Sequence, residues 1–329
     1  MISIYRELTT WLYQHSTAIE SRRQFSDTST IENYAVLEDK AILIITNNYS
    51  AEVYGLKSLH KEPLFRLHLR QPTSAFAFDE KSFILITNDG SVRLVTQETT
   101  GKSNKFTQTL QKQLEVKCLR LFCSMITIES EPSLVILNDD QQSLTIWTPK
   151  NVKSLNINLE KSPSSTVRLL QMTSDPFTDN ILFYFENQSL TLYKSASSSQ
   201  TSYDHVNLYS LKKNSLITVD NKEYQLNLHK IDSSDKYRSI HLKTECLQLC
   251  LNESGDYAFV LVKPRVLFMY RMADSKQIGK LFLYDNVTTM IANNDFIVLG
   301  MNDRRLLTLM IADPDDPNLK SKIDALPSR

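Results

Sequence analysis

The sequence predicts an all-β fold of seven similar units, each a four-stranded antiparallel sheet that forms one blade of a seven-bladed β-propeller. Hydrophobic residues make up 41% of the 329 residues, enough for a large buried core. Two apolar runs separated by a polar turn recur along the chain with a period of roughly 40 to 50 residues. Their residues alternate as in strands and lack the 3.6-residue period of a helix.

The recurring pair of runs predicts the second and third strands of each unit. The copies occupy residues 42–56, 83–97, 134–150, 181–195, 215–231, 258–272 and 296–312. Asp89-Gly90 is a strong hairpin signal, because glycine adopts positive φ without strain. The chain has only 6 glycines, and pairs such as Asn47-Asn48 and Asp139-Asp140 take the place of glycine at other turns.

Further runs predict the other two strands of each unit. The first strands are expected at Tyr34–Leu37, Ser74–Phe78, Glu115–Leu121, Val167–Met172, Val206–Leu211, Cys246–Leu251 and Val287–Ala292. The outer strands are expected at 64–69, 105–110, 154–159, 237–242 and 279–284. Residues 196–206 read as a loop, which leaves the fourth unit without a clear outer strand.

We expect residues 1–312 to form a single propeller and residues 313–329 to form a tail. The last unit lacks an outer strand, whereas Ala18–Phe25 is an outer strand without a unit. Pairing the two would close the ring and remove an open edge that promotes aggregation. Residues 1–17 are an extra N-terminal segment, which either caps the ring or belongs to a longer repeat array.

Several stretches resemble the WD40-repeat family. LTIWTPK (144–150) and LTTWLYQHSTAIESRRQF (8–25) are similar to the family's third strand, turn and fourth strand, and TTGKSNKF (99–106) to its connection between those strands. No copy has the Trp-Asp dipeptide or the Gly-His pair, so the family's Asp–His–Ser/Thr–Trp network is assigned to no residue here.

The stretch 296–329 resembles the end of NACHT and WD-repeat proteins. In that family a propeller follows a nucleotide-binding switch module. The resemblance implies that this chain is the sensor or autoinhibitory propeller of such a protein.

Charge and composition exclude several classes of function. The 37 basic and 37 acidic residues balance, which argues against a nucleic-acid or anionic-membrane partner. No apolar stretch is long enough to span a membrane. The N-terminal residues lack the apolar run of a signal peptide, and 4 cysteines are too few for a disulfide framework. We expect a cytoplasmic domain that is monomeric.

The reactive residue types form no recognisable catalytic, cofactor or metal site. Gly101-Lys102-Ser103 lacks the first glycine of a phosphate loop, since Thr96 stands there. Cys118 and Cys123, and Cys246 and Cys250, lack the spacing of zinc ligands and are expected in the core, the second pair on one face of a strand.

The histidines, the aspartates of 313–316 and the C-terminal tail are also expected to have structural roles. The six histidines are scattered, and His68 and His241 are expected to face solvent from outer strands. The aspartates of 313–316 lack EF-hand spacing, and their prolines predict an extended exit from the last strand. The tail 318–329 could form a short amphipathic helix.

The turns between second and third strands should lie together on one rim of the ring. Single polar residues in such turns are usually just solvated, but this set changes from amide and acidic to basic along the chain. A broad charged surface suits recognition of a protein. The partner-binding candidates are Asn48, Tyr49, Asp89, Asp139, Asp140, Lys222, Lys263, Arg265, Arg304 and Arg305.

The function predicted from these patterns is that of a non-catalytic scaffold for protein–protein interaction, without cofactor or metal. The alternative is a hydrolase or lyase with its site at the central channel. Enzymes of that kind need several charged residues converging from the first strands. Those strands are mostly apolar here, with only Arg120 and Arg168 nearby, which favours the scaffold.

Overall fold

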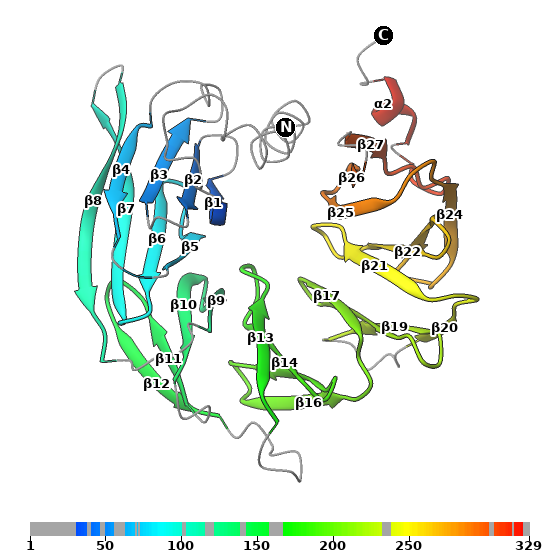
Figure 1. Ribbon diagram of the computed structural model, residues 1–329, viewed down its shortest axis with the longest axis horizontal. Coiled ribbons are helices and arrows are strands. Elements are labelled where there is room, and N and C mark those ends of the chain that lie inside the picture. The colour runs from blue at the N-terminus through cyan, green and yellow to red at the C-terminus, as the bar shows by residue number, and fades with distance from the viewer. Residues whose placement is uncertain are drawn as a thin grey trace. The chain divides into compact units, whose positions relative to one another are not determined.

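The computed structural model shows a chain built of β-strands (Figure 1). The residues that it describes are 31–37, 41–46, 50–55, 63–69, 71, 73–100, 103–115, 122–138, 143–157, 167–231, 238–302, 306–317 and 319–324. Within these ranges the only helix is α2 (Leu319–Asp324). None of the described helical residues forms a segment long and apolar enough to cross a membrane.

The contacts divide the chain into two compact units, Met1–Ser202 and Tyr203–Arg329. The described strands of each unit form antiparallel sheets and pair in the order of the chain. The sheets of the first unit are β1 (Ile31–Leu37), β2 (Ala41–Thr46), β3 (Ser50–Gly55) and β4 (Phe65–His68); β5 (Thr73–Ala77), β6 (Ser82–Thr87), β7 (Ser91–Thr100) and β8 (Ser103–Gln113); β9 (Cys123–Ile128), β10 (Glu131–Leu137), β11 (Ser143–Trp147) and β12 (Val152–Asn156); and β13 (Leu169–Ser174), β14 (Asn180–Phe185), β15 (Leu190–Lys194) and β16 (Ser199–Tyr203).

The second unit contains the remaining sheets. They are β17 (Leu208–Lys212), β18 (Ser215–Asp220), β19 (Gln225–Lys230) and β20 (Arg238–His241); β21 (Cys246–Leu251), β22 (Tyr257–Val262), β23 (Val266–Arg271) and β24 (Gln277–Phe282); and β25 (Val287–Ala292), β26 (Phe296–Met301) and β27 (Leu306–Met310). The described residues therefore form seven sheets, as the repeats predicted.

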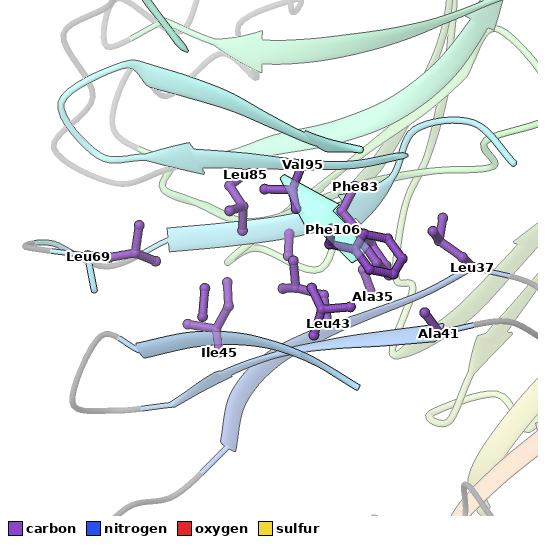
Figure 2. Close-up of a cluster of buried hydrophobic side chains, with 13 residues drawn as sticks. Ala35, Leu37, Ala41, Leu43, Ile45, Leu69, Phe83, Leu85, Val95 and Phe106 are labelled. Carbon is purple, nitrogen blue, oxygen red and sulfur yellow. The ribbon is translucent and has the colours of Figure 1, made fainter. Parts of the chain in front are cut away.

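The second strand of a sheet is buried on both faces, because alternate side chains pack against different neighbouring sheets. Phe83 and Leu85 of β6 pack with Leu43 of the first sheet, as Figure 2 shows. Ile84 and Ile86 of β6 pack in another cluster with residues of the third sheet. Sheets stacked face to face along the chain explain why these strands are almost wholly apolar, as in an interior covered on both sides.

The second unit is built in the same way. Ile217 and Val219 of β18 pack against one face of the sixth sheet, β21–β24. Phe259 and Leu261 of β22 pack against β25–β27 on the other face. Because each buried strand serves two interfaces, its register is strongly fixed.

Most predicted strands are confirmed, but two predictions about them are wrong. The first strand of the third sheet is Cys123–Ile128, not Glu115–Leu121. It joins β10 through Glu129 and Ser130, which both have positive φ, so the hairpin lacks the usual Asn-Gly signature. The fourth sheet has an outer strand, Ser199–Tyr203, in a stretch of Ser and Thr that resembled a loop.

Cys246 and Cys250 lie on opposite faces of β21, contrary to the prediction. The register of β21 against β22 shifts by one residue between Cys246 and Gln248. This bulge reverses the alternation of side chains. Cys246 consequently packs toward β17–β20 and Cys250 toward β25–β27, whereas Cys118 lies outside the described residues.

The segment after β27 turns back and does not leave the sheet as an extended chain. The amide of Asp316 donates to the carbonyl of Asp313 (3.0 Å), and the amide of Asp315 donates to Oδ1 of Asp313 (3.0 Å). The Asp313 side chain is 5% exposed and binds Arg271 of β23. The helix predicted in the tail is present as α2.

The N-terminal predictions concern residues outside the described ranges. Neither 1–17 nor the proposed closing strand 18–25 is described. Within the described residues the last sheet has three strands, β25, β26 and β27. Closure of the ring therefore stays a prediction.

Candidate binding rim

Four of the predicted rim residues lie in described turns, namely Asp89, Lys222, Lys263 and Arg265. All four are exposed. The others lie outside the described ranges; they are Asn48, Tyr49, Asp139, Asp140, Arg304 and Arg305.

Asp89 stabilises its own turn in the first unit. Its Oδ1 accepts hydrogen bonds from the hydroxyl of Thr87 (2.5 Å) and the amide of Ser91 (3.0 Å). The Thr87 hydroxyl is the main reason that the pKa of Asp89 lies below its ordinary value. Gly90 completes the turn with a φ of 82°. This carboxylate is thus chiefly a structural group.

The turn that carries Lys222 lies beside the connection from β20 to β21. Asn221 joins the two, because its Nδ2 donates to the carbonyl of Cys246 (3.1 Å) and its Oδ1 accepts from the amide of Cys246 (3.0 Å). The amide of Leu242 donates to the carbonyl of Tyr224 (2.6 Å). The Lys222 side chain is therefore presented from a turn fixed by the next sheet.

Lys263, Pro264 and Arg265 form the corresponding turn of the sixth sheet and show the same arrangement. The amide of Lys263 donates to the carbonyl of Glu245 (3.0 Å), and its Nζ forms an ion pair with the Glu245 carboxylate. The Arg265 guanidinium donates to the carbonyl of Tyr284 (2.9 Å). Two connections between successive sheets, 242–245 and 283–286, thus line this rim together with the turns.

Sequence reasoning missed the contribution of these connections. Glu245 and Tyr284 lie on the rim beside Lys263 and Arg265, and the Tyr284 side chain is exposed. The stretch 279–284 was recognised only as an outer strand. The sequence of an alternating strand does not show whether another part of the protein covers its apolar residues.

The other reactive residues have structural environments. Burial raises the pKa values of the Cys246 and Cys250 thiols to about 12, so both are protonated at neutral pH. Burial lowers the pKa of His229 to about 4. Its ring contacts that of Tyr203 in a tilted arrangement, with 4.7 Å between the ring centroids. His68, His241 and Arg168 are exposed, and Arg120 lies outside the described ranges.

The described part of the chain contains no group of three or more His, Cys, Asp or Glu side chains that could hold a metal ion. Gly101 and Lys102 are not described, but Ser103 opens β8. A phosphate loop needs a helix at that position. The strand thus contradicts a Walker-type site.

Comparison with solved structures shows the fold to be that of a β-propeller. The chain is similar to BamB from Moraxella catarrhalis (TM-score 0.58, 10% identity, 88% of each chain covered). It is also similar to Sqt1 from Saccharomyces cerevisiae (TM-score 0.58, 11% identity, 86% of this chain and 83% of that one).

A third similar structure is Raptor from Chaetomium thermophilum (TM-score 0.53, 10% identity), where the match covers 86% of this chain and 28% of that one. No protein-family model matches the sequence. No curated protein matches it either. These identities establish the architecture only.

Proposed function

We propose that this protein is a non-catalytic scaffold that binds a protein partner through the rim formed by its second-to-third-strand turns. The observation that carries this proposal is the turn Lys263–Arg265, which presents two exposed cations. The Arg265 guanidinium binds the backbone carbonyl of Tyr284, whose side chain is also exposed. Arginine and tyrosine are enriched at protein–protein interfaces, and exposed charges steer and orient a partner of opposite charge.

In the described part of the rim, the turns with Lys222 and with Lys263–Arg265 are held by contacts with the neighbouring connections. Lys263 is held by Glu245, and Arg265 by the carbonyl of Tyr284. Side chains that are already oriented lose less conformational freedom when a partner binds. This supports a binding role more than a role as plain solvated loops.

Reversing the rim charges tests the proposal. A variant with Lys263, Arg265, Arg304 and Arg305 changed to Glu should capture the partner from native extract at least about tenfold less than the intact chain does. Thermal unfolding should change little, because Lys263 and Arg265 are exposed and surface pairs contribute little stability.

A matched control reverses the same number of positive charges outside the turns of the rim. Lys105, Lys112, Lys153 and Arg238 are exposed in outer strands, and their change to Glu should leave capture intact. Equal loss of capture in both variants would show a general charge effect. Loss of stability with capture retained in the rim variant would refute the rim proposal.

The sequence of residues 296–329 resembles the end of NACHT and WD-repeat proteins. On this ground we propose that the partner is a nucleotide-binding switch module and that the two interact in the cytoplasm. In that arrangement the propeller acts as the sensor or autoinhibitory part. Recovery of a NACHT-type nucleotide-binding protein by the intact chain, and not by the rim variant, is the expected outcome. Recovery of unrelated proteins alone would contradict this assignment of the partner.

A further inference from the structure

The outer strand of the sixth sheet, β24, exposes a cluster of large apolar side chains. Leu281 is 37% exposed, Phe282 70% and Tyr284 56%. The only covered residue in this run is Leu283. Figure 1 shows β24 at the edge of its sheet opposite β21, and among the described residues β24 pairs only with β23.

Other outer strands have a different surface. In β8, β16 and β20 every exposed residue is polar or charged. In β12 the only exposed large apolar side chain is Val152, at 40%. Polar edges prevent unwanted strand pairing, and an apolar edge invites it. The exposed apolar side chains of β24 therefore need a physical explanation.

The register shows which backbone groups of β24 point outward. The amide of Leu283 donates to the carbonyl of Arg265, so this pair is a hydrogen-bonded pair of the antiparallel ladder. Such pairs alternate with pairs that do not exchange hydrogen bonds. Lys280 and Phe282, opposite Phe268 and Val266, fall in the second class. Their N–H and C=O groups consequently point away from β23, toward the open edge.

The same two residues form a cation–aromatic cluster on one face of the strand. Nζ of Lys280 lies 4.8 Å from the ring centroid of Phe282 and 5.8 Å from that of Phe268. No acidic residue occurs from Gln277 through Tyr284. The edge thus combines open backbone groups, an exposed ring and one uncompensated positive charge.

We propose that β24 binds an extended segment of a partner protein, which adds to the sheet as a fifth strand. Backbone hydrogen bonds to Lys280 and Phe282 would supply affinity, and side chains would supply specificity. Charge complementarity assigns the segment an acidic residue opposite Lys280 and an apolar residue two positions away, opposite Phe282. This site adjoins the Lys263–Arg265 turn, since Phe282 pairs with Val266, but it uses the open edge of β24 and can bind whether or not the rim proposal is correct.

A synthetic peptide can serve as the probe. A labelled peptide Thr-Leu-Thr-Asp-Thr-Leu-Thr places Leu and Asp on one face and Thr on the other. We expect saturable binding to the whole chain by fluorescence polarisation. Hydrogen exchange should slow at the amides of Lys280 and Phe282. The same peptide N-methylated at its Asp and Leu amides should not bind, because it lacks the strand's donors.

Two substitutions test the side-chain contacts. Phe282→Ser should weaken binding at least about tenfold, as expected for an exposed aromatic anchor. Lys280→Glu should reverse the preference, so that a peptide with Lys in place of Asp binds better than the original. Val152→Ser and Lys153→Glu in β12 are matched controls, because this outer strand also exposes a valine beside a lysine. They should leave binding unchanged.

Several outcomes would overturn the proposal. One is the absence of saturable binding by the wild-type chain. Another is equal binding of the N-methylated peptide, which would mean a side-chain patch without strand addition. Concentration-dependent dimerisation of the wild-type chain, abolished by Phe282→Ser, would assign the edge to a second copy. Loss of peptide binding in the rim variant alone, with β24 variants unaffected, would place the binding site elsewhere.

Discussion

At the scale of single residues, asparagine and aspartate side chains fix turns that glycine fixes in most proteins. Oδ1 of Asn252 accepts from the amide of Tyr257 (2.9 Å), and Oδ1 of Asn293 accepts from the amide of Phe296 (2.7 Å). A short polar side chain that binds nearby backbone favours a turn over a strand. This explains how a chain with 6 glycines makes so many hairpins.

Gly255 is a position where only glycine fits. Its φ is +76°, and a Cβ there would lie 2.8 Å from the backbone carbonyl oxygen of Lys212. We expect Gly255→Ala to lower the free energy of unfolding by roughly 1–3 kcal/mol, because backbone cannot move aside easily. Urea denaturation measures this change.

Gly279→Ala is the control for that substitution. Its φ is ordinary, and the added Cβ would meet the Met269 side chain at 3.2 Å. The contacted atom is Cβ of Met269, and a shift of a few tenths of an ångström relieves the contact, so the loss should be smaller than at Gly255, where the contact is closer and φ is positive. Equal losses would contradict the argument from positive φ.

Asp313 makes stability depend on pH. Its carboxylate accepts from Arg271 Nε (2.8 Å) and from the Tyr257 hydroxyl (3.0 Å), and chiefly the Arg271 hydrogen bonds lower its pKa from 3.8 to about 2. A lowered pKa stabilises the folded state above pH 3.8, and this contribution, up to roughly 2 kcal/mol, is lost as pH falls through 2.

The Asp313→Asn variant tests this contribution. Urea unfolding of the wild type and the variant should differ at pH 7 and converge near pH 2. The Asp315→Asn variant should show a smaller difference, since Asp315 is exposed. A difference between wild type and Asp313→Asn that is independent of pH would show that packing, and not charge, stabilises this contact.

At the scale of elements, inner and outer strands are held by different forces. The second strands β2, β6 and β22 consist mostly of buried apolar residues, and the sequence predicted their positions well. Outer strands such as β16 (Ser199–Tyr203) gain mainly backbone hydrogen bonds on one side. Composition therefore says little about them, and β16 was missed.

Deleting residues 1–25 tests the proposed closing strand. If Ala18–Phe25 pairs with the last sheet, the deletion leaves the edge of β27 open and promotes self-association. Light scattering after gel filtration should show oligomers or aggregates.

A deletion of residues 1–17 is the matched control, since it retains the proposed strand. This shorter deletion should remain monomeric. A longer deletion that is also monomeric and as stable as the full chain would refute closure by residues 18–25.

At the scale of the whole molecule, each described unit is a row of sheets that share their faces. Residues next to each other in β6 or β22 belong to different hydrophobic clusters. A sheet covered on both faces by other sheets requires consecutive apolar residues, which is the repeated signal in the sequence. That signal was enough to predict the propeller, and the similarity to BamB and Sqt1 agrees with it.

The sequence by itself determined the repeated strand pairs, their turns and the all-β class, because burial on two faces imposes a strong local pattern. Only the tertiary structure decided features that depend on distant neighbours. The bulge in β21 separates Cys246 from Cys250, and the fold brings Asp313 to Arg271. It also leaves Phe282 uncovered at a sheet edge. Contacts between residues far apart in the chain set these features, and no local pattern of side chains records them.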